Sequence, residues 1–283
     1  MSEDKTPKIN PHYMQRFLHT EQPFPDNYIE DWFLQDMRLN YHVTILPLKD
    51  IIKESFALLQ TISNVVLFNI LFFLVAKEEI EITPVYILDI VLFIFCFISC
   101  IPLQISPLHF CGWRSIIIFA VVWGLTPIIS SITNGFDPQS IVIISSILFI
   151  LHICTFDYGY INNYVDKING VVSFNAVLFA CVVLCSILPQ NNMVFGLISL
   201  SILLFEFTPI LRHYFYQKSL WMYYGFTFGL VCITLIACFM YSIIMGLIYL
   251  FICIVVSYLG PKLWLKTVSL KRFVFYYYCI CLL

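Results

Sequence analysis

Long apolar runs separated by short polar stretches occupy most of the chain after residue 55. The first 55 residues are polar and mixed in charge, without an apolar run that would indicate a secretory signal peptide. A membrane-spanning helix needs about 20 consecutive apolar residues. That pattern predicts an all-α membrane protein with helices near 56–76, 86–105, 115–133, 139–156, 171–189 and 193–211.

The next apolar run, from Trp221 to Tyr258, is too long for one span. As a single helix it would measure roughly 57 Å, against about 30 Å of hydrocarbon. We expect two helices with a break between Tyr241 and Gly246, where Ser242 and Gly246 weaken the helix. The sequence therefore predicts a polytopic bundle of eight transmembrane helices.

The distribution of Lys and Arg tests this count, because short cytosolic loops carry the excess of positive charge. Eight spans place 14 of the 15 Lys and Arg residues on one side, with Arg212 and Lys218 in the loop after the sixth span and Lys77 alone opposite. A seven-span topology would divide them 10 to 5. We predict cytosolic termini, a cytosolic N-terminal segment over 1–55, a transmembrane domain over 56–259, and a cytosolic or interfacial tail over 260–283.

Composition agrees with a membrane protein: 60% of residues are hydrophobic, 11% are charged, and the mean hydropathy is +0.89. The formal net charge of −2 and the lack of a long basic cluster argue against nucleic acid as a partner.

Candidate chemistry is sparse. We find no phosphate-binding glycine loop, zinc motif or nucleophile elbow, and we predict no catalytic, cofactor-binding or metal-binding residues. Asp157 and Asp166 are candidates for acid and base, but a helix cap and a polar partner surface explain them better. Glu206 and His152 lie deep in apolar helices, where a structural hydrogen bond outweighs a transport role.

An ordered element precedes the apolar body at residues 22–41. Two prolines fix the backbone of Gln22-Pro23-Phe24-Pro25-Asp26-Asn27-Tyr28, and Asp26 or Asn27 can cap a following helix. The apolar side of that helix comprises Tyr28, Trp32, Phe33, Met37 and Tyr41. This order predicts a docking surface.

The same heptapeptide, continued through Arg38 and Asn40, closely resembles the start of the PIG-C family, whose members are subunits of phosphatidylinositol N-acetylglucosaminyltransferase. The resemblance recurs at Phe156-Asp157-Tyr158-Gly159, at Gly124 with Pro127, and along the fifth helix at Ser173, Asn175, Phe179, Ala180, Leu184, Ser186, Leu188 and Pro189. It runs from about residue 20 to 260 and fades after Pro261.

The resemblance implies a subunit of the endoplasmic reticulum complex that transfers N-acetylglucosamine from UDP-N-acetylglucosamine to phosphatidylinositol, the first step of glycosylphosphatidylinositol (GPI) anchor biosynthesis. It implies a non-catalytic, multi-pass scaffold without a cofactor, partnered by the catalytic protein PIG-A and by PIG-H, PIG-P, PIG-Q and PIG-Y. The expected partner-binding residues are Gln22, Pro23, Phe24, Pro25, Asp26, Asn27, Tyr28, Asp157 and Tyr158. Candidates for attracting the lipid headgroup are Arg38, Arg212 and Lys218.

Two other classes fit the eight helices: a solute or ion transporter using Glu206, and a free-standing membrane transferase. A transporter would move solute in proteoliposomes without partners, and an enzyme would turn over alone.

Overall fold

The computed structural model describes residues 46–100, 113–133, 135–164 and 170–268, and these residues form helices and no strands. Residues 47–264 group as one compact unit, and residues 1–46 and 265–283 lie outside it. The helices are α2 (Leu48–Ala76), α3 (Thr83–Cys100), α5 (Trp113–Ile129), α6 (Pro138–Thr155), α7 (Tyr158–Ile161), α8 (Val171–Cys185), α9 (Asn191–Ile202), η1 (Leu203–Phe207), α10 (Thr208–Lys218), α11 (Leu220–Tyr241), α12 (Ile243–Ile254) and η2 (Val255–Leu259).

Helix α2 is longer than the sequence predicts. It begins at Leu48 instead of near residue 56 and runs for 29 residues, or about 44 Å. The polar turn from Lys49 to Glu54 is helical because nothing in it breaks the hydrogen-bond ladder after Pro47. Helix α2 therefore extends beyond the thickness of a hydrocarbon core.

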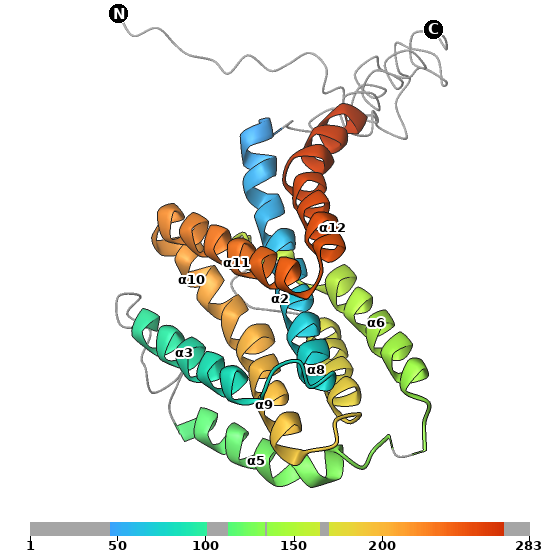
Figure 1. The fold of residues 1–283 in the computed structure, drawn as a ribbon. Helices are drawn as coiled ribbons and strands as arrows, with labels where there is room; N and C mark the ends of the chain where they lie inside the picture. The colour runs from blue at the N-terminus through green and yellow to red at the C-terminus, as the bar shows by residue number, and fades with distance from the viewer. Residues whose placement is uncertain (1–45, 101–112, 134, 165–169, 269–283) are drawn as a thin grey trace, which may run out of the picture. The chain divides into compact units, whose positions relative to one another are not determined.

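The continuous segment α9–η1–α10 is the most deeply buried part of the described bundle. Helices α3, α5 and α8 pack against α9, while α11 packs against α10, α2 and α12 (Figure 1). Helix α12 leaves most of its surface exposed, as expected of a helix at the lipid-facing edge. Polar side chains on α9–α10 thus face protein and not lipid.

Side-chain contacts fix the directions of α2, α11 and α12. Gln60 in the first half of α2 contacts Thr227 in the first half of α11, and Lys77 just after α2 contacts Tyr241 at the end of α11. These two helices are therefore parallel. Helix α12 returns beside α2, so the start of α2 and the end of α12 lie at the same end of this unit (Figure 1).

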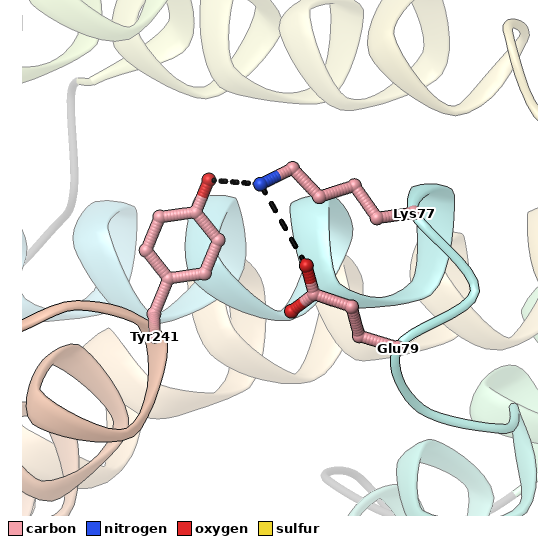
Figure 2. Close-up of polar contacts among 3 residues, drawn as sticks. All are labelled: Lys77, Glu79 and Tyr241. Atoms are coloured by element: carbon pink, nitrogen blue, oxygen red, sulfur yellow. Dashed lines mark hydrogen bonds and ion pairs between the residues drawn. The ribbon is translucent and has the colours of Figure 1, made fainter.

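The contact at the opposite end joins Lys77, Glu79 and Tyr241 (Figure 2). The Lys77 ammonium donates to the Tyr241 hydroxyl at 3.0 Å and lies 3.8 Å from a Glu79 carboxylate oxygen. The hydrogen bond to Tyr241 raises the pKa of Lys77. This exposed cluster is screened by water, so it orders the turn more than it stabilises the fold.

Two π-helical turns each end two residues before a proline. In η1 the Thr208 N–H bonds the Leu203 carbonyl, and Pro209 follows. In η2 the Gly260 N–H bonds the Val255 carbonyl, and Pro261 follows. Because proline has no N–H, the next carbonyl of the π ladder loses its donor, and the wider turn accommodates the ring.

The predicted break in the last long apolar run is confirmed. Ser242 adopts an extended conformation, with φ −166° and ψ 140°, between the last residue of α11 and the first of α12. Within the described residues five helical segments are long and apolar enough to cross a membrane, and three apolar helices are shorter. The count of eight crossings stays a prediction.

The close approach of α11 and α12 gives a test of their packing. A methyl group on Gly246 would lie 2.3 Å from Phe239 Cδ1, so Gly246→Ala must displace that ring. We expect the free energy of unfolding to fall by about 1–2 kcal/mol, measured by thermal unfolding in detergent. Gly229→Ala is the control, because nothing lies within 4 Å of its added methyl group. Equal unfolding temperatures for the two variants would contradict this packing.

Candidate functional site

The predicted site residues divide into two groups. Gln22 to Tyr28 and Arg38 lie outside the described residues. Asp157 and Tyr158 lie at the start of α7, between α6 and α8, while Arg212 and Lys218 lie in α10. Helices α7 and α10 are in contact, so the structure brings Asp157, Tyr158 and Arg212 into one region.

Helix α7 is a single turn held by its own side chains. The Asp157 carboxylate accepts from the Tyr160 N–H at 3.2 Å, which confirms the predicted helix cap. The Tyr158 hydroxyl donates to the Ile153 carbonyl at 2.6 Å, and the Phe156 and Tyr158 rings meet edge to face. The Phe156-Asp157-Tyr158-Gly159 motif therefore builds a fixed corner after α6.

His213 attaches this corner to α10. Its ring stacks on Tyr160 with centroids 4.1 Å apart, and its Nδ1–H donates to the Tyr160 carbonyl at 2.6 Å. The Gln217 amide donates both to His213 Nε2 and to Asn163 Oδ1. All donors and acceptors match when His213 is neutral with its proton on Nδ1.

The corner also contacts the start of α2. The Asn162 amide donates to the Glu54 carbonyl at 3.3 Å, and the exposed Tyr164 hydroxyl donates to the Glu54 carboxylate. This last hydrogen bond raises the pKa of Tyr164 to about 12. Helices α2, α7 and α10 thus meet at one end of the bundle.

Arg212 does not lie in a loop, as the charge distribution suggested. Helix α10 continues to Lys218, and Arg212 is only 1% exposed. Its Nη1 donates to Gln60 Oε1 at 3.3 Å, and its guanidinium carbon lies 5.8 Å from the centre of the Phe156 ring. Helix α2 and the residue before the α7 corner supply these contacts, which keep the charged side chain inside the bundle.

Gln60 connects Arg212 to α11. Its side-chain amide donates to the Thr227 hydroxyl, which in turn donates to the Tyr223 carbonyl at 2.7 Å. Burial raises the pKa of Tyr158, and the nearby Arg212 cation opposes that rise. We call Arg212, Gln60, Tyr158, Tyr223 and Thr227 the Arg212 cluster.

Sequence reasoning missed the α2 and α11 members of this cluster. The available signal was a group of polar residues, Gln60, Thr61, Ser63 and Asn64, inside an otherwise apolar helix. Polar residues in membrane helices face other helices, so they mark contact surfaces. Lys218, by contrast, is exposed at the end of α10, as expected for an interfacial cation.

The deep polar residues are separate from the Arg212 cluster in role. His152 Nδ1 and the Ser173 hydroxyl lie 2.7 Å apart, a buried hydrogen bond that joins α6 to α8. Glu206 is half-buried in η1, and among the described residues it forms no ion pair. Nothing here supports the transporter alternative.

Comparisons with known proteins agree on one family. The family model described as phosphatidylinositol N-acetylglucosaminyltransferase matches residues 14–275. A Dictyostelium discoideum protein described as a putative PIG-C-type subunit of this transferase is 33% identical over 254 residues, covering 88% of this chain and 73% of that protein. The Schizosaccharomyces pombe GPI2 subunit is 26% identical, with 92% and 82% covered, and the human PIG-C protein is 24% identical, with 70% and 68% covered. No solved structure matches the chain.

The match includes the N-terminal heptapeptide, α7 and the Arg212 cluster, and it extends past residue 261, where the resemblance drawn from the sequence faded. The chain belongs to the GPI2 (PIG-C) family of phosphatidylinositol N-acetylglucosaminyltransferase subunits.

Proposed function

We propose that this chain is a non-catalytic membrane subunit of the complex that transfers N-acetylglucosamine to phosphatidylinositol, the first step of GPI-anchor biosynthesis. The observation that carries this proposal is the family match over residues 14–275. The proposed location is the endoplasmic reticulum membrane, with both termini in the cytosol. That orientation rests on the distribution of Lys and Arg.

The reaction explains why such a subunit is needed. The bond between the sugar and UDP breaks, a bond to an inositol hydroxyl oxygen forms, and that hydroxyl loses its proton. The donor is dissolved in water and the acceptor is held in the bilayer, so the two must be positioned together. We assign the sugar chemistry to PIG-A and the positioning of complex and lipid to this chain.

We further propose that residues 22–41 and the corner around α7 dock partner subunits, among them PIG-A, PIG-H, PIG-P, PIG-Q and PIG-Y. Asp157 and Tyr158 act by holding the corner in shape, since both side chains bond within it. The exposed Asn163 and Tyr164 then offer a polar and aromatic contact surface. Arg38 and Lys218 are proposed to attract anionic headgroups at the same face.

Docking through the N-terminal segment is tested by changing Asp26, Asn27 and Tyr28 together to alanine in the full chain. Recovery of partner subunits by gentle affinity purification should fall about tenfold, because such anchors carry most of an interface's free energy. Replacing Glu78 and Glu81 by alanine is the control, since the topology places both on the opposite face. Unchanged recovery in the triple variant would contradict docking through this segment.

The function itself is tested by transfer of labelled N-acetylglucosamine to phosphatidylinositol. We expect activity in the assembly recovered from microsomes and none from the purified chain alone. Turnover by the chain alone would overturn the assignment of a non-catalytic role. An intact, inactive assembly would overturn the proposed membership of this complex.

A further inference from the structure

The buried cation of Arg212 has no counter-charge among the residues that the structure describes. Within those ranges the one ion pair joins Lys77 and Glu79, at the other end of α2. Gln60 is a neutral acceptor, and no described residue accepts from the Arg212 Nε–H. A buried charge without an opposite charge is strongly unfavourable, and in a membrane helix it marks a functional site. An anion at this position would remove that cost.

A second unsatisfied group lies beside it. Tyr223 in α11 is 0% exposed, and its hydroxyl has no hydrogen-bond partner in the described part of the chain, since the nearby Gln60 amide donates to Thr227 instead. Tyr223 and Arg212 lie close enough for their charges to interact. A buried hydroxyl normally finds a partner. One anion between the two would accept from both the guanidinium and the hydroxyl.

The depth of Arg212 suits a lipid phosphate. Arg212 lies six residues before the end of α10, which is about 9 Å along the helix. Lys218 and the 86% exposed Trp221 mark the membrane interface at the α10–α11 turn. A side chain at that depth reaches the boundary between headgroups and hydrocarbon, where a phospholipid carries its phosphate.

A path of aromatic rings and a second cation leads from the surface to this point. The Lys53 ammonium lies 4.7 Å above the Tyr216 ring, and Tyr216 meets Tyr223 edge to face at 5.2 Å. Tyr224 lies beside Tyr223 at 6.0 Å. Rotation of these rings opens a route between α10 and α11 without breaking helix hydrogen bonds.

We propose that Arg212 and the Tyr223 hydroxyl bind the phosphate diester of an anionic phospholipid, which enters between α10 and α11. The inference rests on the proposed function, which makes phosphatidylinositol the occupant. A diester carries one negative charge and balances one guanidinium, whereas the diphosphate of the sugar donor carries more. The site thus holds the lipid acceptor at the end of the bundle formed by α2, α7 and α10.

The test measures lipid binding to the full chain. Purified protein in detergent is titrated with phosphatidylinositol and, separately, with phosphatidylcholine, and bound lipid is counted by native mass spectrometry. Arg212→Gln should reduce the affinity for phosphatidylinositol about tenfold, since hydrogen bonds to charged groups are the strong ones. Lys218→Gln, an exposed cation on the same helix, should change it less than about twofold.

Tyr223→Phe distinguishes binding from a structural role. Its hydroxyl has no partner among the described residues, so removing it should leave the unfolding temperature unchanged or higher. We nevertheless expect a fall in phosphatidylinositol affinity of about threefold to tenfold. This variant also decides the question if Arg212→Gln fails to fold.

Equal affinity of Arg212→Gln or of Tyr223→Phe and the unchanged chain for phosphatidylinositol would overturn the proposal. So would equal binding of the two lipids by the unchanged chain. Displacement of the lipid by soluble inositol phosphate or UDP at matched concentration would identify a free phosphate ester as the occupant, against our assignment. If the chain still assembles and supports transfer in those cases, the proposed function stands and only the lipid site fails.

Discussion

Replacing Gln60 by leucine should lower the free energy of unfolding by about 3 kcal/mol. Leucine has a similar volume, so the change leaves little empty space. It removes the acceptor for Arg212 Nη1 and the donor to Thr227, leaving a buried cation without a polar partner among the residues that the structure describes. The measurement is the thermal unfolding of the full chain in detergent, followed by circular dichroism.

Asn69→Leu is the matched control, because Asn69 is a partly buried amide on the same helix whose hydrogen bond reaches only the Val65 carbonyl one turn away. We expect it to change the free energy of unfolding by less than about 1 kcal/mol. Similar effects of the two substitutions would mean that Gln60 does not carry the buried charge.

Gln60→Glu separates stability from lipid binding. A carboxylate at this position lies within reach of Arg212 Nη1 and supplies the missing opposite charge. The unfolding temperature should then be close to that of the unchanged chain, while phosphatidylinositol affinity falls because the cation is already paired. Retained lipid affinity in a stable Gln60→Glu chain would argue against Arg212 as the phosphate ligand.

The helices could be predicted from the sequence because their signals are local. A run of 38 apolar residues cannot span as one helix, and Ser242 interrupts it where the sequence predicts. The π-helical turns were not predicted, although Pro209 and Pro261 mark both. A proline within an apolar helix indicates a missing donor, but the choice between a kink and a wider turn depends on the neighbouring helices.

The position of Arg212 could not be predicted in the same way. A hydropathy window ends at the first strong charge, so the sixth span stopped at residue 211 and Arg212 was assigned to a loop. Its burial depends on Gln60, which is 152 positions away along the chain, and on Phe156. No local pattern contains those contacts.

The polar group in the middle of α2 carried more information than we used. Gln60 contacts Arg212, the Ser63 hydroxyl lies 2.7 Å from that of Tyr249, and the Asn64 amide donates to the Leu204 carbonyl. Each of these residues satisfies a polar group on a different helical element. Several polar residues within one turn of an apolar helix therefore predict a central helix, although not its partners.

Asn64→Leu should lower the free energy of unfolding by about 2 kcal/mol. The Asn64 amide donates at 2.9 Å to the Leu204 carbonyl in η1, the carbonyl that would otherwise pair with residue 209 in the π ladder. Pro209 has no N–H to offer it. Because Asn64 Oδ1 has no partner among the described residues, the substitution isolates the loss of this one donor.

A double-mutant cycle with Pro209→Ala tests this explanation. Alanine restores an N–H that can bond the Leu204 carbonyl, so Asn64→Leu should cost at least about 1 kcal/mol less in the Pro209→Ala chain than in the unchanged one. Unfolding of all four chains in the same detergent gives the coupling. Effects that add within about 0.5 kcal/mol would show that Asn64 and Pro209 act independently. A positive coupling would mean that a side chain of α2 compensates for the proline that shapes the helix carrying Arg212.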